Sequence, residues 1–261
     1  MPVSAEKVAK GLWWEAPWGL VVGCTAVSSG CAHCWAKSQH DRFRKRLGRK
    51  AFNVVVPRED RLMLPMRRGI PTVYAVWNDL FHAHVPGNFI DRAWEIMWLA
   101  KHHRFVVLTK RAERMRELSP RSRLSNVVLG VSVEDQKTAD ERIPHLIKTP
   151  AACRMMSYEP VLGPVDFGGF RHERQCDGHP AHLCDERCCY TSRIDWLITG
   201  PETGAGRRPC ETDWIRDAAQ QVRRAGVPVF IKALPIGKRI SKDPAEWPAD
   251  LRLREFPEML K

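Results

Sequence analysis

Three cysteines near the start of the chain have the spacing of cofactor ligands. Cys24, Cys31 and Cys34 belong to the string GCTAVSSGCAHCWA at residues 23–36. A structural zinc site normally has four ligands, and a disulfide joins two cysteines in an oxidising compartment. Three thiolates can instead bind three irons of a 4Fe–4S cluster and leave the fourth iron open to a non-protein ligand. Small residues around them allow a tight loop whose N–H groups face the sulfides.

The open iron of such a cluster suits the amino and carboxylate groups of S-adenosylmethionine, a cofactor of radical chemistry. Two alternatives stay open for this string. Cys153 or Cys210 could complete a four-ligand zinc site. The three cysteines could also be unligated and structural.

A second group of cysteines and histidines lies in the string HERQCDGHPAHLCDERCC at residues 172–189. Such a polar, core-poor segment is typical of a metal-binding knot that folds when the metal binds. The candidate ligands are Cys176, His179, Cys184, Cys188 and Cys189, with His172 and His182 nearby. Zinc is the first expectation, and an auxiliary iron–sulfur cluster or a weakly chelating loop are the alternatives.

The overall charge points to a polyanionic partner. The 261-residue chain has a formal net charge of +12, which favours a nucleic acid or a nucleotide-like substrate. Six basic residues crowd one stretch, namely Arg42, Arg44, Lys45, Arg46, Arg49 and Lys50. A solvated basic face without a ligand is the alternative.

The chain is expected to be a cytoplasmic protein. No apolar run approaches the length of a membrane span, and the first residues lack the apolar core of a signal peptide. In that compartment the nine cysteines would stay reduced, which favours metal or cluster ligation over a disulfide framework.

Short apolar runs alternate with helical patterns and predict an α/β fold with parallel strands buried on both faces. The expected strands are 19–24, 72–77, 105–109, 126–132, 153–158, 195–200 and 227–233, and the clearest helices are 88–103, 135–148 and 213–225. Repeated βα units predict a partial or nearly closed (β/α) barrel, with a doubly wound open sheet as the rival. The barrel is expected to span residues 1–240 with a metal-binding insertion at 168–193, and residues 241–261 form a tail around the outside.

Polar side chains follow nearly every expected strand. In (β/α) barrels the active site is built at the carboxyl ends of the strands, so these residues predict a charged pocket there. They are Asn78, Asp79, His82, Lys110, Arg111, Ser132, Glu134, Ser157, Glu159, Glu202 and Lys232. Asp79, Lys110, Glu202 and Lys232 are the candidates for substrate contacts or proton transfer. An exposed first helical turn is the alternative for Lys110, Arg111 and Glu134.

Several strings resemble radical SAM proteins, specifically a phage- and prophage-associated three-cysteine branch related to spore photoproduct lyase-like proteins. They are GCTAVSSGCAHCWA, WNDLFHAHVP, FVVLTKR, NVVLGVSVEDQKTADERI, MMSYEPVLGPV, IDWLITGPETG and AGVPVFIK, spread over residues 13–235. The resemblance implies a radical SAM-like TIM barrel with Cys24, Cys31 and Cys34 as ligands of a 4Fe–4S cluster.

The resemblance also implies cofactor contacts. Ser132, Glu134, Ser157 and Glu159 match positions that contact the ribose and aminoacyl groups of S-adenosylmethionine. The string Gly200-Pro201-Glu202 matches a Gly-Gly-Glu string of the branch. The cysteine spacing here is CxxxxxxCxxC where CxxxCxxC is common. His33 stands where a larger aromatic is usual, either to pack on the adenine or as a surface residue.

The expected function is an enzyme that cleaves S-adenosylmethionine and abstracts hydrogen from a substrate. The charge and the resemblance indicate a nucleobase or a nucleic-acid-linked group, as in phage DNA modification or repair, and a base in duplex would have to be flipped out. An electron donor is an implied partner. The alternatives are a zinc-containing nucleic-acid-binding protein without radical chemistry and an iron–sulfur redox sensor. Binding of S-adenosylmethionine separates the first from both others.

Overall fold

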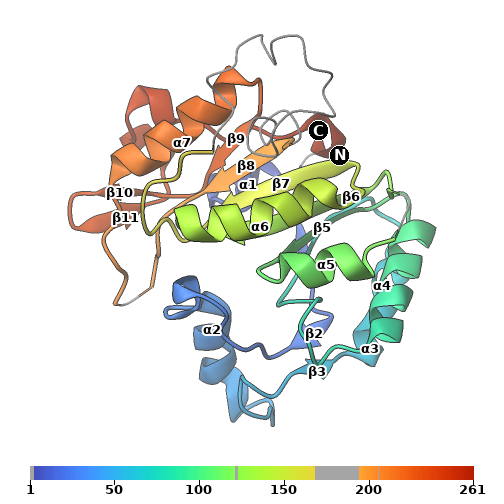
Figure 1. The fold of residues 1–261 in the computed structure, drawn as a ribbon. Helices are drawn as coiled ribbons and strands as arrows, with labels where there is room; N and C mark the ends of the chain where they lie inside the picture. Colours follow the sequence, from blue (N-terminus) through green and yellow to red (C-terminus); the bar gives the residue numbers. More distant parts are fainter. Residues whose placement is uncertain (1–2, 121–122, 168–193, 205) are drawn as a thin grey trace.

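A curled sheet of seven parallel strands organises the molecule (Figure 1). The computed structural model describes residues 3–120, 123–167, 194–204 and 206–261. The sheet strands, in spatial order, are β1 (Ala16–Trp18), β4 (Val73–Val76), β5 (Arg104–Thr109), β6 (Val127–Val133), β7 (Cys153–Tyr158), β8 (Trp196–Thr199) and β9 (Val229–Ile231). Short antiparallel pairs join β2 (Val21–Val22) to β3 (Val56–Pro57) and β10 (Leu234–Ile236) to β11 (Arg239–Ser241).

The helices connect these strands. They are α1 (Ala5–Ala9), α2 (Trp35–Arg44), α3 (Glu59–Leu62), α4 (Gly87–Leu99), α5 (Ala112–Leu118), α6 (Gln136–Lys148) and α7 (Thr212–Arg224). The described 3-10 turns are η1 (Ser29–Cys31), η2 (Pro65–Arg67), η4 (Pro244–Glu246), η5 (Ala249–Leu251) and η6 (Glu258–Leu260). The three helices expected from apolar periodicity correspond to α4, α6 and α7. Asp135 begins α6, since its carboxylate accepts the Thr138 N–H at 2.9 Å in a capping box.

The strand order favours the barrel over the doubly wound sheet. After β1, each parallel strand is added on the same side of the one before it, from β4 to β9. A doubly wound sheet reverses direction at a switch point, and this sheet does not. The fold is therefore a mixed α/β structure with a curled, half-barrel sheet, compatible with a partial (β/α) barrel.

Both faces of the sheet are buried, because side chains alternate along each strand. One face, with Tyr74 and Val107, packs against the apolar stripes of α4, α5, α6 and α7. The opposite face, with Val106 and Trp196, packs against the chain ends, including Trp13 and Leu260. Burial on both faces is the reason that the strands have continuous apolar sequences.

The C-terminal segment covers the β9 edge of the sheet. The Ile231 N–H donates to the Leu253 carbonyl at 2.9 Å, and the Glu255 N–H donates to the Val229 carbonyl at 2.9 Å. Phe256 packs on Trp196 across the face opposite the helices. Residues 241–261, expected as a tail around the outside, thus contribute hydrogen bonds to the β9 edge and side chains to the face of the sheet opposite the helices.

The first strand of the sheet also differs from the expected one. The sheet uses Ala16–Trp18, whereas residues 19–24 contribute only the two-residue β2. Gly23 adopts φ +87°, and an added Cβ there would lie 2.5 Å from the Val54 carbonyl oxygen. This close approach of two backbones takes the chain out of the sheet before it reaches Cys24. In the parts of the chain that the structure describes, no helix is both long and apolar enough to cross a lipid bilayer.

Candidate functional site

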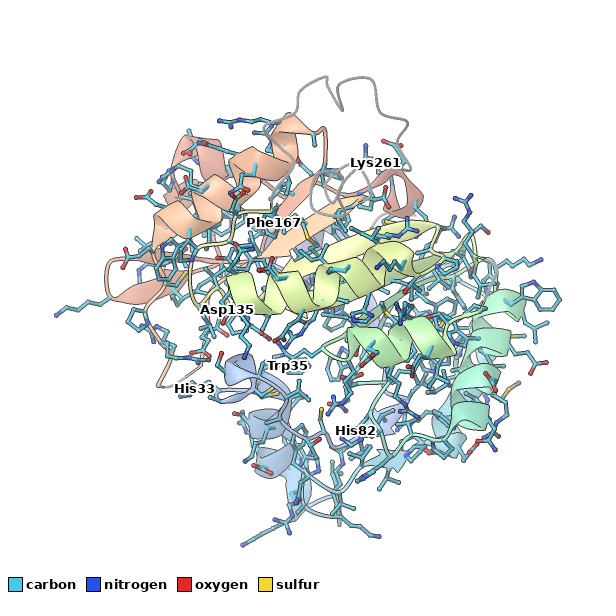
Figure 2. All side chains as sticks on the ribbon, in the orientation of Figure 1. His33, Trp35, His82, Asp135, Phe167 and Lys261 are labelled. Carbon is cyan, nitrogen blue, oxygen red and sulfur yellow. The ribbon has the colours of Figure 1, made fainter. Side chains whose placement is uncertain are left out.

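The cysteine loop, residues 24–34, is held at the carboxyl ends of the parallel strands. The Ser28 hydroxyl donates to the Glu134 carboxylate, just beyond β6, with 3.1 Å between Oγ and Oε1. Gly30 lies against the same side chain, since an added Cβ would be 2.5 Å from Glu134 Cγ. In the view of Figure 2, His33 and Trp35 are drawn below Asp135, the residue that begins α6. The loop therefore lies at the end of the sheet where barrel active sites are built.

Glu134 is a buried acidic centre with three partners. Its side chain is fully buried and forms ion pairs with Lys110, just after β5, and with Arg142 from α6. The Arg142 Nη1 donates to Glu134 Oε1 at 3.1 Å and to the Ser132 carbonyl at 2.6 Å. Ser28 is the third partner. Glu134 thus joins two strand ends, one helix and the cysteine loop.

A second network lies behind Cys24. The Arg111 guanidinium donates to Asp79 Oδ2 at 2.6 Å, to the Thr25 carbonyl at 3.0 Å and to Cys24 Sγ at 3.7 Å. Asp79 also accepts from the Thr109 hydroxyl at 2.6 Å. Burial, followed by the nearby Asp79 carboxylate, raises the pKa of the Cys24 thiol, while Arg111 acts in the opposite direction. Arg111 therefore places a positive charge beside the first cysteine.

His82 belongs to the same network. Its Nδ1 accepts the His84 N–H at 3.1 Å, so the proton is on Nε2, which lies 2.8 Å from the Thr25 hydroxyl. Burial, and then the charge of Arg111, lowers the pKa of His82. The imidazole is therefore neutral near pH 7 and fixes Thr25 beside Cys24.

A third contact comes from the loop that follows β8. Glu202 accepts the Arg208 backbone N–H at 2.8 Å and pairs with its guanidinium. That guanidinium also donates to the Ser29 carbonyl in the cysteine loop at 3.0 Å. Burial acts to raise the pKa of Glu202, but the hydrogen bonds from Arg208 outweigh it and hold the pKa below its ordinary value. The exposed His33 lies beside Gly206 of the same loop.

The ion pair between Lys232 and Glu159 is the most solvent-exposed of the four ion pairs at the strand ends. Lys232, just after β9, lies 3.1 Å from Glu159 Oε1, and the Ser157 hydroxyl donates to Glu159 Oε2 at 3.3 Å. The side chains of Lys232 and Glu159 are 34% and 19% exposed, whereas that of Glu134 is 0% exposed. Gly200 allows this approach, because an added Cβ would lie 3.0 Å from Glu159 Oε1.

The polar residues expected at the carboxyl ends of the strands, here called the rim residues, therefore come together. Each candidate acid or base among them has a partner of opposite charge. Asp79 pairs with Arg111, Lys110 with Glu134, Glu202 with Arg208 and Lys232 with Glu159. Their catalytic and cofactor-binding roles stay predictions. Ser132 contributes its carbonyl to Arg142, and its side chain is buried.

The expected iron–sulfur cluster would take its ligands from the cysteine loop. Cys24, Cys31 and Cys34 are all half-buried free thiols. Among the described residues, no group of three or more His, Cys, Asp or Glu side chains is placed to hold one metal ion. In a 4Fe–4S cluster each thiolate binds a different iron, so its ligands lie farther apart than the ligands of one ion.

The two remaining described cysteines, Cys153 and Cys210, lie outside the cysteine loop. Cys153 is buried at the start of β7, whereas the cysteine loop lies at the opposite end of the strands. Burial raises the pKa of Cys153 to about 12 and that of Cys210 to about 12. In the absence of a bound metal, burial therefore keeps both thiols neutral near pH 7. Cys176, His179, Cys184, Cys188 and Cys189 lie outside the described residues.

Sequence patterns alone missed four residues that build the site: Thr25, Ser28, Arg142 and Arg208. Arg142 had a visible signal, because it falls on the apolar stripe of α6 between Ala139 and Ile143. A charged residue on such a stripe indicates a buried partner. The other three lie in loops whose course depends on tertiary contacts.

Comparison with known proteins corrects the family expected from the motifs. A family model described as "Protein of unknown function (DUF5131)" matches residues 9–244, and no radical SAM family model matches. Assignment to the radical SAM superfamily and its phage-associated branch is therefore wrong. FVVLTKR, MMSYEPVLGPV and IDWLITGPETG each contain most or all of a strand of the parallel sheet and the residues at its carboxyl end, so they reflect the fold. No curated protein and no solved structure matches the chain. Because the family match covers most of its length, the chain belongs to the family of proteins of unknown function named DUF5131.

Proposed function

We propose that the protein is an iron–sulfur enzyme that uses a 4Fe–4S cluster to cleave S-adenosylmethionine and abstract hydrogen from a nucleobase or another nucleic-acid-linked group. The observation that carries this proposal is the cysteine loop itself. Cys24, Cys31 and Cys34 are half-buried thiols on a segment fixed at the carboxyl end of a partial barrel. The proposal rests on these residues and not on family membership.

The three thiols leave one iron of the cluster without a protein ligand. When bound, a reduced cluster of this kind supplies one electron to S-adenosylmethionine, which yields methionine and a 5′-deoxyadenosyl radical. The chain's own part is to hold the loop in shape. Glu134 fixes it through Ser28, Arg208 fixes it through the Ser29 carbonyl, and Arg111 donates to the Cys24 sulfur.

The rim residues divide into two groups by their exposure. Glu134 is fully buried with three partners, so we assign it to positioning the loop. Lys232 and Glu159 keep part of their surface open to solvent. We therefore propose this pair, with Ser157, as the group that receives the polar end of S-adenosylmethionine. Asp79, Lys110 and Glu202 support the site through their ion pairs.

The test is product formation by the full chain. After anaerobic reconstitution with iron and sulfide, and reduction in the presence of S-adenosylmethionine, 5′-deoxyadenosine should form and be measured by chromatography. Cys31→Ser should abolish it. Cys210→Ser is the matched control and should retain it, because that thiol lies outside the cysteine loop and packs against the hydrophobic core.

Two results would contradict the proposal and point to the alternatives. Zinc retained by the cysteine loop, with no iron, would favour a zinc protein. A cluster that forms but neither binds nor cleaves S-adenosylmethionine would favour a redox sensor.

A further inference from the structure

One region of the chain holds most of its net charge. Residues 35–70, here called the basic lobe, comprise α2, β3, α3 and η2 with their connections. They contain eleven Lys or Arg and three Asp or Glu, a net charge of +8 out of the chain's +12. Figure 1 shows α2 projecting away from the sheet and from the helices that cover it.

The basic side chains at the end of α2 lack acidic partners. Within the described ranges, no ion pair involves Arg42, Arg44, Lys45, Arg46, Arg49 or Lys50, and all but the half-buried Arg49 are exposed. Arg42, Lys45 and Arg46 share one face, because the helical turn continues through the Leu47 N–H bond to the Phe43 carbonyl. The guanidiniums of Arg42 and Arg46 both lie over the Phe43 ring. The helix dipole favours cations in the last turn, but it does not account for the basic residues beyond it.

Exposed apolar side chains accompany this charge. Trp35 begins α2 and is 56% exposed, with its ring at 5.2 Å and 76° from that of Trp77. An edge-to-face contact of this kind leaves much of the Trp35 ring open. Base stacking on an exposed aromatic ring beside a basic surface is the usual basis of single-strand binding.

The position of Trp35 connects this surface to the cysteine loop. Trp35 directly follows Cys34, and the basic face lies about 10–17 Å farther along the helical turns, at 1.5 Å per residue. A strand whose backbone follows the basic face would therefore bring its bases towards the loop.

We propose that the basic lobe binds a nucleic acid strand, with phosphates on the face of Arg42, Lys45 and Arg46 and an unpaired base on Trp35. Charge complementarity favours this occupant. An anionic membrane fits less well, because a membrane-surface helix needs a continuous apolar face, and α2 buries only His40. This inference deepens the proposed function, and it rests on that function only for what happens to the bound base.

Binding is measured on the full-length protein without S-adenosylmethionine or reductant, so its outcome is separate from that of the cleavage assay. Fluorescence anisotropy would follow a labelled single-stranded DNA oligonucleotide, and the same sequence as duplex, over a series of salt concentrations. The variant Arg42→Gln/Lys45→Gln/Arg46→Gln should bind the single strand about tenfold more weakly or worse. The logarithm of the binding constant falls as the logarithm of the salt concentration rises, and in this variant the steepness of that fall should decrease by about 2.

The matched control removes the same charge elsewhere. Arg224→Gln/Lys238→Gln/Lys242→Gln changes three exposed residues at the end of α7 and around β10 and β11, and it should bind like the unchanged protein. Trp35→Ala should weaken single-strand binding by about fivefold or more and affect duplex binding less.

Two outcomes would overturn the proposal. The first is equal loss of binding in the two triple variants, which would show only a non-specific effect of net charge. The second is binding to vesicles of anionic phospholipid but not to either form of DNA, which would make the lobe a membrane surface.

Discussion

The charged side chains of the rim are buried or half-buried and ion-paired, whereas those of the basic lobe are mostly exposed and, at the end of α2, not ion-paired in the described structure. At the rim, Glu134 is fully buried and is bonded to Lys110, Arg142 and Ser28. In the lobe, the cations at the end of α2 stand exposed without an acidic partner in the described structure. The rim charges therefore stabilise the folded chain through ion pairs with one another. The cations at the end of α2 in the basic lobe are free to interact with another molecule.

This difference predicts where substitutions should act. Breaking a buried ion pair leaves an uncompensated buried charge, which is strongly destabilising. Exposed pairs contribute little, because solvent screens them. Changes at the rim should therefore alter folding and loop shape, and changes in the lobe should alter binding alone.

The largest effect is expected at Glu134. Glu134→Gln leaves Arg142 buried without a carboxylate and should lower the free energy of unfolding in urea by about 3–5 kcal/mol. The matched lobe variant is Glu59→Gln, which breaks an exposed pair with Arg92 and should cost less than about 1 kcal/mol. Equal costs for the two variants would remove the distinction between rim and lobe.

A smaller effect is expected at Gly30. In Gly30→Ala the new Cβ would lie 2.6 Å from Glu134 Oε1, and Glu134 is too firmly bonded to move aside. The expected loss in unfolding free energy is about 1–3 kcal/mol, with less iron bound after reconstitution. Gly69→Ala in the lobe is the control, since nothing lies within 4 Å of its added Cβ. If Gly30→Ala matched that control in both readouts, the loop would not be held by Glu134.

The smallest effect concerns His103, which fastens the end of the lobe to the sheet. Its Nδ1 accepts the Thr72 N–H at 3.1 Å, and its Nε2 donates to the Pro65 carbonyl at 2.9 Å. Burial lowers the pKa of His103 below its ordinary value of 6.5, and the nearby His102 and Arg68 act in the same direction. The unfolded chain therefore takes up the proton first as the pH falls.

This contribution of His103 is present above pH 6.5 and lost as the pH falls below it. Urea unfolding between about pH 7.5 and about pH 5 should show a decline that is shallower in His103→Gln than in the unchanged protein. His33→Gln, which removes an exposed histidine in the cysteine loop, is the control and should keep the decline. An unchanged slope in His103→Gln would show that other groups, such as His82, account for it.

Much of the scaffold could be predicted from the sequence, because its signals are local. Apolar runs located β4 to β9, and the apolar stripe of α6 was visible from Ala139 to Ile147. The polar residues after these runs, such as Asp79, Glu134 and Lys232, lie at the carboxyl ends of the strands in ion pairs.

The remaining features depend on contacts between distant residues. The exit of the chain after Trp18 depends on the approach of Gly23 to Val54, which leaves no local pattern. The partners of each rim residue, such as Arg208 for Glu202, follow from loop paths that periodicity does not describe. The family was predicted wrongly because the prediction relied on short separate motifs, whereas the matching family model covers residues 9–244 as a whole.

The most direct test of the central claim is the iron content of the reconstituted chain. The account predicts that Cys24→Ala/Cys31→Ala/Cys34→Ala loses about four irons per chain and the broad absorption near about 400 nm typical of iron–sulfur thiolates. Cys153→Ala/Cys210→Ala, which removes only thiols outside the loop, should keep both signals. If the triple variant binds as much iron and sulfide as the unchanged protein, the cysteine loop does not hold the cluster and the proposed function is wrong.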